Sequence, residues 1–168
     1  MKLLSFSFFR FFFLFWVFYM AERSGASLNA HTMFIKTHKL NQVISKPHFF
    51  ILSKGNNSGK PLDAACPNCF VCICKSEEEK QQLYWLFYGL WQGSFFHPFL
   101  TGSVISFIRL DDLKKVAAMA LEKITSNQEQ FTKNISILQL LDDKSKVFME
   151  QVKLIKQAEK ALMYQILK

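Results

Sequence analysis

The feature that most constrains the fold is a run of aromatic and aliphatic residues over 83–91, which follows an acidic helix start. Ser76 precedes three glutamates, and its hydroxyl and the Glu79 carboxylate have the spacing of a capping box. Glutamates in a first turn also suit the helix dipole. Because residues 83–91 carry large apolar side chains on nearly every side, we expect a buried helix that ends near Gly93 and forms the spine of the domain.

The residues after this spine alternate between strand and helix signals. Residues 103–109 are rich in Val, Ile and Phe and predict a strand. Asp111 or Asp112 is then expected to cap a helix. Over 113–124, apolar residues recur every three or four positions with charged residues opposite them, which predicts an amphipathic helix that ends near Ser126 or Asn127.

Residues 128–168 contain neither Gly nor Pro and predict one long helix, in which 142–145 are the expected site of a break or kink. Apolar residues form a narrow stripe along it, a pattern that is typical of helices that pack against another helix. We therefore predict that this helix binds a protein partner or associates with itself, the alternative being that it packs on its own domain. The expected contact residues are Phe148, Val152, Ile155, Leu162 and Ile166.

Together these signals predict an α+β fold, with short strands packed around a buried aromatic helix and a long C-terminal helical arm. At 168 residues the chain is long enough to bury a core. The expected divisions are a hydrophobic N-terminal segment over 1–32, a globular domain over 33–125 and the arm over 126–168.

The N-terminal segment differs in composition from the rest of the chain and admits three interpretations. Eight of the 19 Phe residues lie within the first 20 positions. The apolar run is marginal for a membrane anchor over 3–20, because Arg10 interrupts it. A signal peptide cleaved near Ala30 is a second interpretation. The one we favour is a misplaced start, with the true start at Met33.

A basic segment over 31–60 holds five lysines and no acidic residue, in a chain of net charge +8. Such a segment can contact phosphates, although it can equally be a solvated strand edge. Apolar residues interleave with the lysines near 34–35 and 49–52 and predict two short strands. If the segment binds DNA, the expected contacts are Lys36, Lys39, Lys46, Lys54, Lys60 and, from further along the chain, Arg109.

Residues 55–60, GNNSGK, are not a phosphate-binding P-loop. That motif needs four residues between its glycines and a Ser or Thr after the lysine, whereas here there are three and Pro61 follows. A tight turn or hairpin loop is expected instead.

Four cysteines lie within 66–74. Cys66 and Cys69 have knuckle spacing, so a zinc site that adds Cys72 is an alternative. However, residues 70–74 predict a strand that buries Cys72 and Cys74 on one face, and no second pair of cysteines exists. We therefore expect no metal, no cofactor and no disulfide framework, which favours a cytoplasmic location.

The second half of the chain resembles, in the order and spacing of its segments, one half of a type I restriction-modification specificity subunit. The segments that carry this resemblance are 84–90, 101–105 and 108–113, followed by Glu129-Gln130 and the long helix. That resemblance implies a domain that reads DNA bases and a long helix that contacts partner subunits. The chain is more similar to a small bacterial family of uncharacterised proteins beginning near Met33, which implies no known activity. It departs from the restriction subunits in having a single recognition-like unit.

No motif for catalysis is present, and the adjacent pairs Asp111-Asp112 and Asp142-Asp143 are typical of helix caps or solvated breaks. We therefore expect a non-catalytic DNA-binding or DNA-associated accessory protein. The alternative is a membrane-anchored or soluble protein-interaction module with no role on nucleic acid. DNA, a protein partner and, if residues 1–20 are genuine, a membrane are the expected partners.

Overall fold

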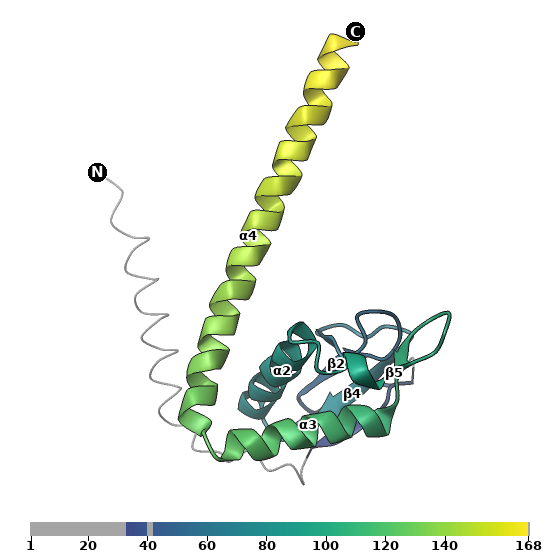
Figure 1. Ribbon diagram of the computed structural model, residues 1–168, viewed down its shortest axis with the longest axis vertical. Coiled ribbons are helices and arrows are strands. Elements are labelled where there is room, and N and C mark those ends of the chain that lie inside the picture. Colours follow the sequence, from purple (N-terminus) through teal and green to yellow (C-terminus); the bar gives the residue numbers. More distant parts are fainter. Residues whose placement is uncertain (1–32, 40–41, 168) are drawn as a thin grey trace, which may run out of the picture. The chain divides into compact units, whose positions relative to one another are not determined.

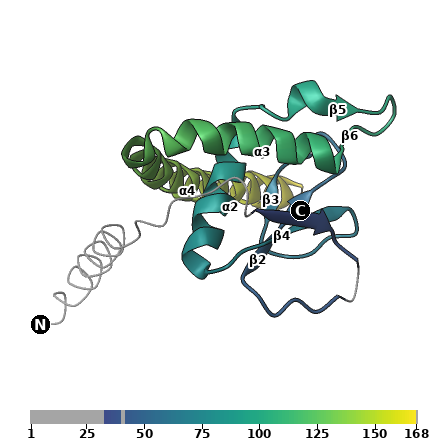
Figure 2. The ribbon, with the colours of Figure 1, turned by 90° about the horizontal axis from the view of Figure 1, so that it is seen from below.

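The computed structural model describes residues 33–39 and 42–167, and these fall into two compact units that divide between Thr132 and Lys133. Their elements can be followed in Figures 1 and 2. In chain order they are β1 (Phe34–Thr37), β2 (His48–Leu52), β3 (Pro61–Leu62), β4 (Cys69–Ile73), α2 (Glu77–Gln92), the 3-10 turn η2 (His97–Phe99), β5 (Leu100–Thr101), β6 (Phe107–Ile108), α3 (Leu110–Thr125) and α4 (Gln128–Ile166). The expected α+β fold is confirmed.

The main sheet has the order β1-β4-β2-β3, with every neighbouring pair antiparallel. The last strand, β4, therefore lies between the first two and pairs with both. The β2 and β3 strands form a hairpin through 53–60, as expected for the glycine-rich turn. Gly59 has a φ of +93° there, and its amide donates to the carbonyl of Leu52 at 2.8 Å.

The two faces of the sheet bury different cores because successive strand residues point to opposite sides. One face contributes Ile35, Phe49, Ile51, Phe70, Cys72 and Cys74 to the main core, which α2 and α3 complete. The opposite face holds a smaller cluster around Phe50, Cys69 and Val71. Within the described residues, the α2 and α3 helices thus cover the first face, and loop residues such as Ile44 and Cys66 pack on the other face.

The α2 helix begins as the sequence predicts. Ser76 is its N-cap, and the Glu79 amide donates to the Ser76 hydroxyl at 3.2 Å. The Glu79 carboxylate in turn accepts from the amide of Lys75, one residue before the cap. Hydrogen bonds from its own backbone amide and from the Ser76 side chain lower the pKa of Glu78. The ionised carboxylate therefore contributes to the stability of the folded state at neutral pH, and this contribution is lost as the pH falls through the lowered pKa.

Burial along α2 is one-sided, which corrects the expectation of a helix buried all round. Leu83, Leu86, Phe87 and Leu90 are buried, whereas the aromatic residues between them are only half-buried. Those aromatic residues contact one another edge-on, as Trp85 does with Tyr88 at 5.0 Å between ring centroids. The helix ends near Gly93 as expected.

The predicted strand over 103–109 exists only as β6, which pairs with β5 in a small second sheet. Residues 103–106 form a turn whose first three residues are exposed, Val104 by 93%. The turn follows Gly102, whose φ of +103° takes the chain out of an extended conformation. Apolar composition alone therefore gave the wrong structure over these four residues.

The α3 helix starts two to three residues earlier than predicted. Its N-cap is Arg109, and Asp111 and Asp112 lie in the first turn, where they face the helix dipole without capping it. Leu113, Val116, Ala117 and Leu121 are buried against the main core, which confirms the amphipathic pattern.

The α4 helix is 39 residues long, about 58 Å at 1.5 Å per residue, and continues through residues 142–145 without a break. It contains no buried residue. Phe131, in its first turn, packs against the main core of the first unit, whereas the second unit consists of the helix from Lys133 onward.

Candidate functional site

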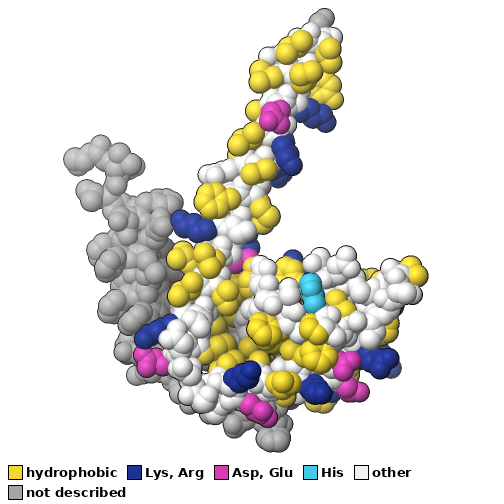
Figure 3. Space-filling view, viewed as in Figure 1, with side chains coloured by type: hydrophobic (Ala, Val, Ile, Leu, Met, Phe, Trp, Pro, Cys, Tyr) yellow, Lys and Arg dark blue, Asp and Glu magenta, His cyan; other side chains and the backbone are white. Residues whose placement is uncertain are grey.

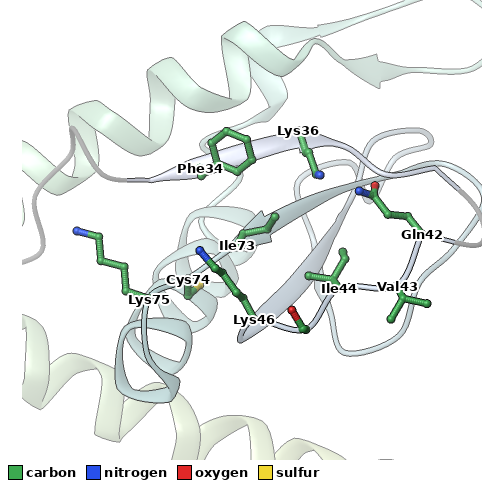
Figure 4. A pocket seen from close by; sticks show the side chains of 10 residues that line it. Phe34, Lys36, Gln42, Val43, Ile44, Lys46, Ile73, Cys74 and Lys75 are labelled. Atoms are coloured by element: carbon green, nitrogen blue, oxygen red, sulfur yellow. The ribbon is translucent and has the colours of Figure 1, made fainter.

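An open pocket of about 550 Å³ lies at the β1 edge of the sheet (Figure 4). Three elements form it: β1, the loop 42–46 that precedes β2, and the residues that end β4. Lys36, Lys46 and Lys75 line it, and none of the described residues that line it is acidic. The described part of the pocket therefore offers positive charge without a lining carboxylate to neutralise it.

The floor of this pocket is apolar. Phe34, Ile44 and Ile73 line it between the lysines, and Phe34 remains 57% exposed. Figure 4 shows the Lys46 side chain extending toward Ile73, whereas the Lys75 side chain extends away from Lys36 and Lys46. Such a surface suits an anion that carries an apolar or aromatic body, because the cations attract its charge and the floor accepts its uncharged part.

The strand pairing explains how distant lysines meet. β1 and β4 are antiparallel, with Phe34 opposite Ile73, so the beginning of β1 lies beside the end of β4. The backbone before β2 reaches the same place, because the Cys74 amide donates to the carbonyl of Pro47 at 2.8 Å. Lys75 was absent from the predicted contacts, since only the strand order reveals its position beside Lys36 and Lys46.

The other predicted phosphate contacts lie elsewhere in the first unit. Lys60 precedes β3, at the opposite edge of the sheet, and its ammonium lies 4.7 Å from the centre of the Trp91 ring. Lys54 pairs in an antiparallel bridge with Phe107, next to the β5–β6 hairpin. Arg109 precedes α3 and is exposed, and Lys39 is exposed beyond the end of β1. Of the six predicted phosphate contacts, the structure thus brings only Lys36 and Lys46 together around this pocket.

The cysteines alternate across β4. Cys72 and Cys74 are buried in the main core, whereas Cys69 belongs to the cluster on the other face, with Cys66 packed beside it. The Cys69 thiol donates to the carbonyl of Cys66 at 2.9 Å. Cys72 therefore does not join Cys66 and Cys69, and within 33–39 and 42–167 no three His, Cys, Asp or Glu residues gather as a metal site.

Hydrogen bonding and burial make two of these thiols poor ligands and nucleophiles. The pKa of Cys72 is raised strongly, first by its side-chain hydrogen bond with Cys74 and then by burial. Burial is likewise the largest cause of the raised pKa of Cys69. Since the thiolate is the reactive form, both residues stay protonated at neutral pH and act as small core side chains.

The second candidate surface is the apolar stripe of α4, which we define as Leu141, Phe148, Val152, Ile155, Leu162 and Ile166. All six side chains are at least half exposed, from 50% for Val152 to 74% for Ile166. A shallow groove of about 410 Å³ runs along the helix between Leu141 and Val152 and exposes almost only apolar atoms. Hydrophobic side chains are visible along much of this helix in Figure 3.

Residues 1–20, the predicted anchor or signal segment, lie outside the described residues. Among the helices that the structure does describe, none combines the length and the apolar character needed to cross a membrane.

In a comparison with known families, residues 35–165 match DUF6943, a family of unknown function. No curated protein and no solved structure matches the chain. The expected relation to an uncharacterised family is thus confirmed, whereas the resemblance to restriction specificity subunits stays a prediction.

Proposed function

Because the chain belongs to DUF6943, whose function is not known, we propose a function from its own residues: a non-catalytic interaction protein that binds another protein through α4. The observation that carries this proposal is the stripe itself. Large apolar side chains that repeat along one line of an exposed helix cost free energy in water, and a facing helix would bury them.

The experiment changes the stripe within the complex isolated from the native host. Ile155→Asp together with Leu162→Asp should release the partner, since two carboxylates in an apolar helix contact are costly to bury. The matched control is Gln157→Asp together with Tyr164→Asp, which adds the same charge to the same helix away from the stripe. The mass of each complex is measured by light scattering.

Loss of the partner from the stripe variant alone supports the proposal. An unchanged mass in that variant, with helix content retained by circular dichroism, would overturn it. Equal loss in both variants would also count against the stripe as the contact, because the control leaves it intact.

The pocket favours a second candidate function, a DNA-associated accessory role of the kind that the resemblance to restriction specificity subunits implies. Lys36, Lys46 and Lys75 would contact backbone phosphates from the β1 edge. Binding of this kind weakens steeply as salt rises, because phosphate contacts release counterions.

We expect Lys36→Gln together with Lys46→Gln to weaken duplex DNA binding and to reduce the slope of log affinity against log salt by about 2, roughly one per lost phosphate contact. Lys123→Gln, which removes an exposed charge from the last turn of α3, is the control and should lower the slope less. Binding that is absent, or whose salt slope is the same in all variants, would rule out this pocket as the contact.

A further inference from the structure

We infer that the helix that covers the α4 stripe belongs to a second copy of this chain and runs antiparallel to the first. This inference rests on the proposed function and names the partner. It starts from the heptad pattern of α4, in which the stripe occupies the two core positions of successive heptads. Asn134, Ser145 and Glu159 are the polar residues that fall on those same positions.

A parallel pair of identical helices would place each residue of the stripe opposite its own copy. Glu159 would then face Glu159 within the apolar seam, with no cation at the flanking positions, which hold Ala158 and Met163. Two like charges that oppose one another in an apolar seam disfavour that arrangement.

An antiparallel pair removes this conflict. If the two helices cross around Phe148 and Val152, Phe148 faces Val152 of the second copy, and Leu138 faces Leu162. Glu159 then faces Leu141, which has Lys144 one turn further along the same face. The acidic residue thus meets an apolar side chain and a nearby ammonium group instead of another carboxylate.

The flanking charges select the register. In this arrangement Asp142 lies opposite Lys156 of the second copy, and the two-fold symmetry of the pair forms that contact twice. A shift by one heptad in either direction would place Asp142 opposite Met149 or Met163 and lose both contacts. Asp142 already pairs with Lys146 of its own helix, so the carboxylate would lie between two cations.

The test is charge reversal in the purified full chain under reducing conditions, with self-association measured by analytical ultracentrifugation. Asp142→Lys or Lys156→Asp alone turns both contacts into like-charge pairs, and each should raise the dimer dissociation constant about tenfold or more. The two changes together restore opposite charges across the pair and should recover most of the lost affinity.

The matched controls are Asp143→Lys and Lys153→Asp, which reverse charges on the same helix at positions that face away from the stripe. These should leave dimerisation nearly unchanged, and circular dichroism confirms that each variant keeps its helix. Rescue in the double variant supports the antiparallel register, because a parallel pair does not bring these two residues together.

Dimerisation without rescue would overturn the antiparallel register and leave the proposed function intact. A parent chain that stays monomeric would overturn the second copy as the partner. The proposed function is then judged separately by whether the host complex survives the Ile155→Asp and Leu162→Asp changes.

Discussion

At the residue scale, two glycines of the β2–β3 turn differ in what surrounds them. Gly55 has a φ of +89° and Gly59 a φ of +93°, so both adopt a backbone conformation that side chains rarely allow. A Cβ at Gly55 would enter open space, whereas one at Gly59 would fall inside van der Waals contact with the ring of Phe96. Phe96 is 1% exposed and has little room to move.

We therefore expect Gly55→Ala to lower the free energy of unfolding by about 1 kcal/mol, the cost of a positive φ. Gly59→Ala carries the same cost and, in addition, about 1–3 kcal/mol for overpacking against Phe96. Urea unfolding of the two variants measures the difference. Equal losses would mean that the Phe96 ring yields to the methyl group.

At the scale of elements, the start of α2 was easier to predict than the strand over 103–109. Ser76 and the glutamates after it specify the beginning of α2 by local chemistry, and the structure confirms it. The strand predicted over 103–109 was wrong over its first four residues, since Val104 and Ile105 have strand-forming side chains but lie in a turn after Gly102. A hairpin of two-residue strands depends on pairing, which composition does not encode.

The cap of α2 gives a prediction at this scale. Ser76→Ala should lower the free energy of unfolding by about 1 kcal/mol, because the Glu79 amide loses its acceptor. Ser76→Asp should keep most of the stability, since a carboxylate also accepts that hydrogen bond. Thermal unfolding followed by circular dichroism compares the two, and equal losses in both variants would show that the hydroxyl does more than cap the helix.

The candidate sites were predictable to different degrees. The α4 stripe was found from its spacing alone, because helical periodicity is local. The pocket at the β1 edge was not predicted: Lys36 and Lys46 were two of six expected phosphate contacts, and Lys75 joins them only through the pairing of β1 with β4. The cysteine alternation was predictable because a strand fixes which side chains share a face.

At the scale of the whole molecule, the described residues form two units of different character. The first buries two apolar clusters around its sheet, whereas the second is a helix without buried residues. Most of the stability of a helix in a protein comes from packing of its apolar face, which the second unit does not supply to itself. The proposed α4 contact would therefore stabilise the helix as well as recruit the partner.

The strand order also has a consequence for synthesis on the ribosome. The β1 and β2 strands emerge early but do not pair with each other, because the strand between them, β4, is not translated until Cys69–Ile73. Until β4 leaves the exit tunnel, β1 has no strand partner and β2 can pair only with β3, and closing the long loop from β1 to β4 slows folding relative to a sheet of sequential hairpins.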